Sequence, residues 1–243
     1  MNKRDEVDHW ILRKEDLLSY IKKLASSNID FFCFQEVVSE QLSDLKAALP
    51  EYCYIGKQRS KEGSGEYNPI FYNYQYSLLM EETCWLSETP EVMGSRYPGA
   101  LCSRIYTHGL FKHKVKGFEL HLVNTHLDHM CAEARVFSAN RLCDLVSPFN
   151  GPTLICGDFN AGPSTEEVLV MKKHMSCAHD VSHNLTPTFN GFDDSSTDLI
   201  DYVFGKNLQF IDYDVIKTKR ENTRNISDHS TVIAAMLIES NQQ

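Results

Sequence analysis

Eight polar side chains stand at the ends of apolar runs in this 243-residue sequence. Carboxylate oxygens are the ligands that Mg²⁺ and Mn²⁺ prefer, and histidines beside carboxylates can transfer protons near neutral pH. No serine or cysteine is placed as a nucleophile among them, so direct attack by water is favoured over a covalent intermediate. The combination predicts metal-assisted hydrolysis of a phosphate ester. The eight residues are Glu36, His126, Asp128, Asp158, Asn160, Asp201, Asp228 and His229.

Three of the apolar runs end where polar groups begin. The runs at 31–34, 120–123 and 153–156 are followed by Gln-Glu, by Asn-Thr-His-Leu-Asp and by Gly-Asp-Phe-Asn. Buried strands that end together bring their last residues to one rim, where α/β proteins place ligands. Asp201 and Asp228 instead stand at the start of apolar runs, so their strands must run antiparallel to the first three to reach that rim.

The spacing of apolar residues predicts the elements that position these groups. Apolar stripes at helical spacing predict helices near 17–25, 42–49 and 133–146, and Ser164 with Glu167 has the spacing of a capping box that begins a fourth helix. Some strands follow one another through short turns, which predicts a mixed sheet, or two sheets with helices outside, in an α/β (α+β) fold. The predicted strands cover 31–34, 70–72, 77–80, 109–116, 118–124, 153–156, 201–204 and 231–238.

The composition is that of a globular chain. Lys and Arg total 24 against 33 Asp and Glu, which gives a net charge of −9, and 42 % of the residues are hydrophobic. This balance argues against sequence-blind binding of duplex nucleic acid, which relies on dense basic residues. No apolar stretch reaches the roughly 20 residues that a membrane span needs, and we expect one domain over residues 1–243.

The eight cysteines include no CxxC pair and are expected to be buried, reduced side chains. The first residues are charged and lack the apolar core of a signal peptide. Together these features predict a cytoplasmic protein. His174, His179 and His183 fit no ligand spacing and are expected in solvated loops.

Five short motifs stand in a fixed order, namely FQEV at 34–37, NTHLDH at 124–129, GDFNAGP at 157–163, IDYVF at 200–204 and SDH at 227–229. In this order they resemble the endonuclease/exonuclease/phosphatase superfamily, over nearly the whole chain. The segments GEYNPIFY and WLSETPE look like its bacterial-type branch, which is similar to deadenylase-like exonucleases. The resemblance implies a four-layer α/β sandwich of two mixed β-sheets flanked by helices.

The resemblance also implies a metal site with a base beside it. Glu36 would be the principal ligand of Mg²⁺, with Mn²⁺ as an alternative, and Asp228 would lie near the metal. Asp158 would orient or deprotonate the attacking water. Asn160 would bind a phosphate oxygen and help to hold Asp158.

Two histidines complete the catalytic set that the resemblance implies. His229 would stabilise the phosphoryl charge or act as a base, with Asp201 fixing its ring. His126 would face the leaving group.

Three further residues are assigned to substrate binding, each with a structural alternative. Arg104 matches an arginine that contacts phosphate in relatives, and its alternative is a surface ion pair. Asp128 has the alternative of holding other loop residues. Tyr72 has the alternative of belonging to the core, as strand tyrosines commonly do.

The sequence departs from the family's pattern in two places. Relatives carry an additional strand that ends in an asparagine beside the metal, well before the position of Trp10. Asn2 has no apolar run before it, so we expect that strand and its asparagine to be missing, which would expose strand edges and apolar surface. A basic residue that relatives often have two positions before Asp201 is replaced by Leu199.

The expected function is that of an Mg²⁺-dependent phosphoesterase that hydrolyses a phosphodiester by attack of water. The family branch favours RNA or another single-stranded nucleic acid, cut by a 3′-to-5′ exonuclease or another nuclease. A small phosphorylated molecule or a lipid headgroup is the alternative substrate, and the acidic composition favours it. A non-catalytic binding protein that lost its first strand is the alternative from another class. No protein partner is indicated.

Overall fold

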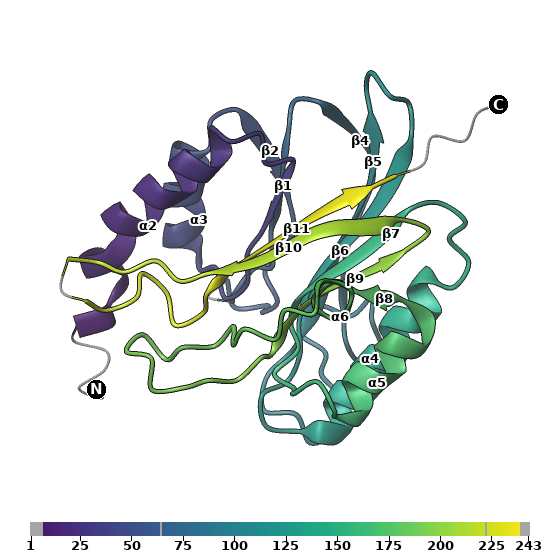
Figure 1. Cartoon of the computed structure of the whole chain (residues 1–243). Coiled ribbons are helices and arrows are strands. Elements are labelled where there is room, and N and C mark those ends of the chain that lie inside the picture. The colour runs from purple at the N-terminus through teal and green to yellow at the C-terminus, as the bar shows by residue number, and fades with distance from the viewer. Residues whose placement is uncertain (1–6, 64, 222, 239–243) are drawn as a thin grey trace.

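The computed structural model describes residues 7–63, 65–221 and 223–238 of the chain (Figure 1). Helices and strands are interspersed along it, as the sequence predicts. The helices are α2 (Trp10–Ala25), α3 (Ser39–Ala48), α4 (Ala132–Val146), α5 (Glu166–His174) and α6 (Ala178–Ser182). The strands are β1 (Phe31–Cys33), β2 (Tyr52–Ile55), β3 (Ile70–Asn73), β4 (Tyr76–Trp85), β5 (Ile105–His113), β6 (Glu119–His126), β7 (Thr153–Asp158), β8 (Ser176–Cys177), β9 (Asp201–Lys206), β10 (Gln209–Ile216) and β11 (Thr231–Leu237).

A six-stranded mixed sheet has the strand order β4-β5-β6-β7-β9-β8. Strands β6 and β7 are parallel, and the other neighbours are antiparallel. Helix α4 provides the long crossover that two parallel strands require. The antiparallel pairing of β7 with β9 confirms that the run that opens at Asp201 runs opposite to the run that ends at Asp158.

Two smaller sheets, β1-β3-β2 and β10-β11, contain only antiparallel pairs. The mixed α/β architecture is therefore confirmed, but the second sheet of the expected sandwich is divided in the described residues. The division arises because β1 and β11 each pair with a strand on one edge only. No other described strand pairs with the second edge of β1 or of β11, and the loss of a strand there stays a prediction.

Three apolar clusters bind the layers to one another. One joins α2 and α3 to the sheet of β1, and a second fills the space between the small sheets and the six-stranded sheet. The third packs α4 and α5 against the other face of the six-stranded sheet. Helices, small sheets, large sheet and helices thus form four layers. Fully buried side chains of the three clusters include Phe71, Ile70, Phe111, Leu142, Ile155 and Phe204.

Helix α5 begins differently from the prediction. Its N-cap residue is Thr165, whose side chain makes no capping hydrogen bond. The expected capping box of Ser164 and Glu167 is wrong because Glu167 is only 2 % exposed and accepts a hydrogen bond from Arg135 Nε at 2.5 Å. The side chain of Glu167 therefore pairs with Arg135 of α4 and does not cap the N-terminus of α5.

Several expectations for single residues also need correction. His179 is buried beside Cys177, with 3.1 Å between its Nδ1 and the Sγ of Cys177, whereas His174 and His183 are exposed. Only Cys143 and Cys177 are buried among the cysteines, and Cys53 is exposed. The expectation for Asn2 lies outside the described residues. Within the described part of the chain, every helix is too short or too polar to traverse a bilayer.

Candidate active site

The six-stranded sheet brings three predicted residues to one rim. His126 ends β6, Asp158 ends β7 and Asp201 begins β9. The register pairs His126 with Asp158, and Asp158 with Asp201. Because directly opposite residues of neighbouring strands lie close together, the three side chains share the edge of the sheet.

Gly157 allows β7 to approach β6 at this rim. Its φ is +145°, and a Cβ at this position would lie 1.9 Å from the carbonyl oxygen of Thr125. Any side chain here would push the two strands apart. The glycine before Asp158 in the motif therefore has a steric reason.

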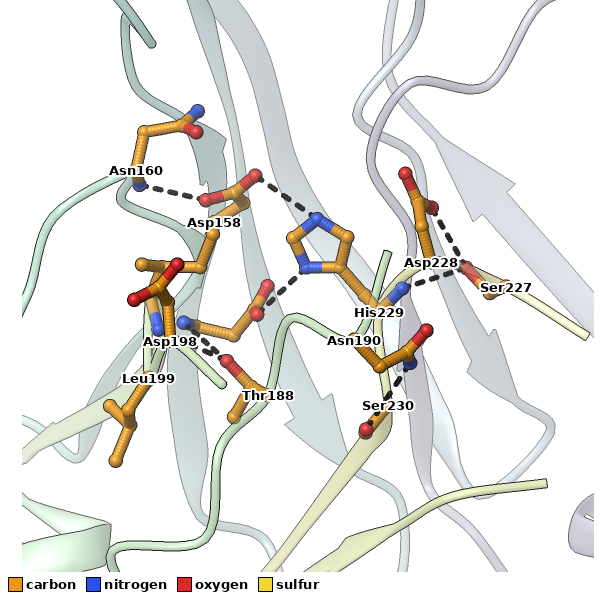
Figure 2. Close-up of polar contacts among 12 residues, drawn as sticks. Asp158, Asn160, Thr188, Asn190, Asp198, Leu199, Ser227, Asp228, His229 and Ser230 are labelled. Atoms are coloured by element: carbon orange, nitrogen blue, oxygen red, sulfur yellow. Dashed lines mark hydrogen bonds and ion pairs between the residues drawn. The ribbon is translucent and has the colours of Figure 1, made fainter. Parts of the chain in front are cut away.

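Asp158 lies at the centre of the group, between Asn160 and His229 in Figure 2. Its Oδ1 accepts the Asn160 N–H at 2.7 Å, and its Oδ2 lies 3.4 Å from His126 Nε2 and 3.8 Å from His229 Nε2. Burial raises the pKa of Asp158 to about 7, and the charge of Asp201 acts in the same direction. This carboxyl group can therefore exchange a proton near neutral pH.

His229 bridges two carboxylates. Its Nδ1 lies 2.8 Å from Asp201 Oδ2, and its Nε2 faces Asp158. A carboxylate only accepts hydrogen bonds, so Nδ1 carries a proton that it donates to Asp201. Burial lowers the pKa of His229, but the negative charges of Asp201, Asp158 and Asp228 outweigh burial and raise it to about 10. His229 is therefore a cation at neutral pH.

The loop between α6 and β9 supports this pair, and the sequence analysis did not single it out. Thr188 Oγ1 accepts the N–H of Asp201 at 3.0 Å, and the ring of Phe189 lies 5.0 Å from the ring of His229. Asn190 N–H donates to the carbonyl oxygen of the residue before His229. The loop has no periodic pattern, so its supporting residues give no signal that could be found in the sequence.

His126 and Asn160 form the other side of the rim. Asn160 Nδ2 donates to His126 Nε2 at 3.0 Å and to the Leu127 carbonyl oxygen at 3.1 Å. Because Nε2 of His126 accepts, its proton is on Nδ1. Burial lowers the pKa of His126 well below its usual value, and the positive charge of Arg104 lowers it further. His126 is therefore a neutral imidazole, in contrast to His229.

Two carboxylates, those of Glu36 and Asp228, lie at the open side of the rim. The side chain of Glu36 is 64 % exposed, and its Oε1 lies 3.9 Å from His126 Nε2. Partial loss of solvent at the carboxylate raises the pKa of Glu36, and the negative charges of Glu66 and Asp228 raise it further. Crowded hard oxygen donors of this kind suit a divalent cation. Both Glu36, at φ +59°, and Asn160, at φ +50°, have left-handed backbone conformations.

Arg13 of α2 is a neighbour of the site that sequence reasoning missed. Its Nη1 donates to the Ile226 carbonyl oxygen at 3.1 Å, which fixes the segment that leads to Asp228. Burial lowers the pKa of Arg13, whereas the charges of Asp228 and Glu36 raise it. A single arginine on a helix has no spacing signal, so only the folded chain reveals its place.

Arg104 lies at the site rather than in a surface ion pair. It is buried, and its Nη2 lies 3.1 Å from His129 Nδ1. Its charge lowers the pKa values of both His126 and Glu36. Among the described residues, its Nε and Nη1 have no hydrogen-bond partner, so the guanidinium retains donors for an anion.

The other two residues assigned to substrate binding are placed elsewhere. Asp128 is 1 % exposed, and its Oδ1 accepts the N–H groups of Met130 and Cys131. It therefore holds the turn that leads into α4. Tyr72 packs against Phe111 in the core between the sheets, with 5.0 Å between the ring centroids. These contacts are structural ones, and the assignment of both residues to substrate binding stays a prediction.

A four-layer α/β sandwich with carboxylates, histidines and an asparagine at one rim defines the class of metal-dependent phosphoesterases. The chain belongs to the endonuclease/exonuclease/phosphatase family, whose sequence profile matches residues 2–229. Members of this family are divalent-metal-dependent hydrolases of phosphate esters, and this chain is one of these enzymes.

Solved structures with the same fold include close matches from Bacteroides. An endonuclease/exonuclease/phosphatase from Bacteroides vulgatus is 29 % identical, with a TM-score of 0.88 over 98 % of this chain and 95 % of that chain. A mannosyl-6-phosphatase from Bacteroides thetaiotaomicron is 31 % identical, with a TM-score of 0.83 over 98 % and 96 %. D. rerio TDP2 with a single-strand DNA product is 16 % identical, with a TM-score of 0.74 over 93 % and 91 %, and shares the fold. The comparison with curated proteins gave no match.

Proposed function

We propose that this enzyme hydrolyses a phosphate ester by attack of water on phosphorus, with Mg²⁺ as its metal. The observation that carries the proposal is the position of Asp158 between two histidines, 3.4 Å from His126 Nε2 and 3.8 Å from His229 Nε2. One carboxyl group that titrates near neutral pH, one cation and one neutral imidazole are the parts that such a hydrolysis needs.

Glu36 and Asp228 fit the metal better than the other acidic residues do. Ligand atoms of Asp158, Asp201 and His229 lie within 4.8 Å of one another, but the proton on Nδ1 and the positive charge of His229 oppose a cation there. The negative charge of Asp228 instead raises the pKa of Glu36, and a divalent cation between the two carboxylates would relieve this repulsion. When bound, Mg²⁺ would polarise a phosphoryl oxygen.

Asp158 and His229 then have complementary roles at the phosphoryl group. Asp158 accepts a proton from the attacking water, because its pKa of about 7 keeps the base form available at neutral pH. His229 places its positive charge where negative charge develops on the phosphoryl oxygens. Asp201 positions the ring of His229 through the bond to Nδ1.

His126 and Arg104 serve the remaining sides of the phosphate. His126 is the neutral imidazole that faces the leaving group, and Asn160 holds its Nε2. Arg104 uses its two unpartnered nitrogen donors for a phosphate oxygen. These roles follow the family resemblance for residues that lie at one rim.

A small phosphorylated molecule is the substrate class that the comparisons favour. The Bacteroides mannosyl-6-phosphatase is 31 % identical, whereas D. rerio TDP2 with its DNA product is 16 % identical. The net charge of −9 also opposes a long polyanion. RNA or another single-stranded nucleic acid is the second candidate, because GEYNPIFY and WLSETPE look like the deadenylase-like branch.

The test measures hydrolysis by the full chain with Mg²⁺, using a chromogenic phosphodiester, mannose 6-phosphate and a labelled RNA oligonucleotide. Glu36→Gln and His229→Asn should each lower the rate roughly 10²- to 10³-fold. Glu51→Gln is the matched control, since Glu51 is an exposed carboxylate between α3 and β2, and it should retain the wild-type rate.

The outcomes separate the candidates. Release of phosphate from mannose 6-phosphate without cleavage of RNA supports the small substrate, and a 3′-to-5′ ladder on RNA supports the nuclease. A well-folded sample without turnover on any of the three substrates, at any concentration of Mg²⁺ or Mn²⁺, would refute the proposal in favour of a non-catalytic protein.

A further inference from the structure

Asn124 is a polar side chain in an apolar layer of the molecule. It belongs to β6, where Leu120 and Leu122 pack into the apolar cluster between the six-stranded sheet and the small sheets. Because side chains alternate between the two faces of a strand, Asn124 and His126 continue the same face. Asn124 is 0 % exposed, so its amide is stable there only with hydrogen-bond partners inside the protein.

The partners of this amide lie at the ends of β1 and β3. Asn124 Nδ2 donates to the carbonyl oxygen of Phe34 at 2.8 Å and to that of Pro69 at 3.0 Å. Its Oδ1 accepts from Gln35 Nε2 at 2.6 Å. Carbonyl oxygens only accept, so they fix which way the amide faces, and Oδ1 then needs a donor, which Gln35 provides. Asn124 therefore connects the six-stranded sheet to the segment that leads directly to Glu36.

Glu36 lies in a bend that needs support from outside. Residues 35 and 36 belong to no helix or strand, and the φ of Glu36 is +59°. A left-handed backbone is unfavourable for a residue with a Cβ and persists where the surrounding contacts determine it. After the bend, Val37 and Tyr67 exchange two backbone hydrogen bonds, at 3.2 Å and 2.8 Å. Before the bend, the amide of Asn124 provides the corresponding contacts.

The side chain that this bend presents is the proposed metal ligand. The Glu36 side chain is 64 % exposed, with its Oε1 3.9 Å from His126 Nε2. An exposed side chain of this length has several rotamers, so the position of its carboxylate depends first on the position of its backbone. Residues that hold a metal ligand in place commonly contribute roughly 10- to 100-fold to metal affinity.

We infer that Asn124, together with Gln35, is a positioning residue that fixes the bend at Glu36 and thereby places the Glu36 carboxylate for the metal. The inference rests on the proposed role of Glu36 as a metal ligand. Asn124 acts through the backbone of Phe34 and the side chain of Gln35, not by contact with metal or substrate. Loss of its amide should therefore weaken metal binding and leave the rate at saturating metal close to the wild-type rate.

The experiment titrates the full chain with Mn²⁺, and electron paramagnetic resonance measures the free ion. No substrate is present, so the readout does not depend on turnover. Asn124→Ala should weaken the binding of Mn²⁺ by about tenfold or more. Gln35→Met keeps the length of the side chain but removes its donor, and it should weaken binding by about threefold or more. Because Gln35 is only partly buried, this variant tests the inference even where Asn124→Ala does not fold.

Two comparisons show whether the effect passes through one amide. Adding Gln35→Met to Asn124→Ala should not weaken the binding of Mn²⁺ further, because Gln35 acts through the amide that is already lost. With the chromogenic phosphodiester as substrate, Asn124→Ala should raise the Mg²⁺ concentration for half-maximal rate by about tenfold. Its rate at saturating Mg²⁺ should stay within about threefold of the wild-type rate.

Asn73→Ala is the matched control. Asn73 is also a buried asparagine, and its Nδ2 donates to Asp30 Oδ1 at 3.0 Å. It lies at the last position of β3, four residues after Pro69 and so roughly 13 Å further along the strand. Both substitutions remove a buried amide, so both should lower the thermal unfolding temperature. Only Asn124→Ala should change the affinity for Mn²⁺.

Glu36→Gln separates a failure of this inference from a failure of the proposed function. If the wild-type protein binds Mn²⁺ no more tightly than Glu36→Gln does, Glu36 is not a ligand and both proposals are wrong. If Glu36→Gln weakens binding while Asn124→Ala and Gln35→Met stay within about twofold of the wild-type affinity, only the positioning role is refuted.

Two further results would overturn the positioning role. Equal weakening of Mn²⁺ binding in Asn73→Ala would show that the effect comes from a general loss of stability. A lower rate at saturating Mg²⁺ with an unchanged affinity for Mn²⁺ would show that Asn124 acts on His126, two positions further along β6, and not on Glu36.

Discussion

The pair of His229 and Asp201 sets the charge at the centre of the site, and the substitution Asp201→Asn tests it. Asparagine keeps the size of the side chain and can still accept the proton on Nδ1, but it removes the negative charge. The Nδ1–Oδ2 distance is 2.8 Å. Two unit charges at that distance attract by about 6 kcal/mol at an effective dielectric constant of about 20.

The change in pKa is smaller than this attraction alone suggests. The amide dipole that remains recovers about half of the interaction, which leaves a loss of about 3 kcal/mol, or about two pKa units. The pKa of His229 should therefore fall from about 10 to about 8 or below, since burial opposes the charged ring. In the unfolded chain the pKa of His229 is about 6.5, and below that pH proton uptake by His229 contributes its full stabilisation of the fold. This stabilisation is lost as the pH rises through the pKa of His229 in the folded protein. In Asp201→Asn this loss should occur at lower pH.

Nuclear magnetic resonance of the His229 ring, followed from pH 5 to pH 11 in the presence of a chelator, measures the shift directly. Asp198→Asn is the matched control, because Asp198 is an exposed carboxylate whose side chain accepts a hydrogen bond from Ser196. It should leave the pKa of His229 unchanged. If His229 titrates within half a unit of the wild-type value in Asp201→Asn, Asp201 does not set the charge and the reasoning is wrong.

Three further predictions concern the scaffold. Burial and the charge of His108 lower the pKa of the half-buried His121 to about 4. The free energy of unfolding measured in urea should therefore fall by about 1–2 kcal/mol from pH 6.5 to pH 4. His121→Gln should reduce this dependence on pH. Arg135→Met should lower the free energy of unfolding by about 3–5 kcal/mol, because Glu167 would stay buried without its partner. Adding Glu167→Gln to Arg135→Met should restore part of this stability. An unchanged free energy of unfolding in Arg135→Met would contradict the prediction. In thermal unfolding, Gly157→Ala should lower the stability of the protein by more than about 4 kcal/mol. Gly162→Ala is the control and should change the stability by less than about 0.5 kcal/mol, because the space around Gly162 is open. Similar values for the two variants would refute the steric argument.

The proximity of Asp158, Asp201 and His229 could be predicted from the sequence for a physical reason. A polar group placed directly at the end of a strongly apolar run cannot be buried with the run, so it must lie at the rim where the run ends. The direction of β9 followed from the same pattern, since Asp201 opens its run instead of closing it. The roles of these residues stay predictions.

The features that could not be predicted from the sequence depend on contacts between residues far apart in the chain. Glu167 pairs with Arg135, which lies 32 positions away, so the local capping pattern was misleading. Arg13 reaches a carbonyl group 213 positions away. Strand β10 was not predicted, because acidic residues at 212 and 214 interrupt its apolar pattern. Local periodicity contains no information about such distant contacts.

Glu36 and Asn160 share a left-handed backbone, which glycine adopts without the clash between Cβ and carbonyl that other residues suffer. Asparagine tolerates this conformation better than most residues, so the preference for glycine is stronger at Glu36 than at Asn160. The carboxylate of Glu36 and the amide of Asn160 therefore stand at two turns whose backbone conformation favours glycine. Selection of variants for heat resistance alone would favour replacement of these side chains, and would remove a carboxylate that we propose as a metal ligand and an amide that we propose at the phosphate.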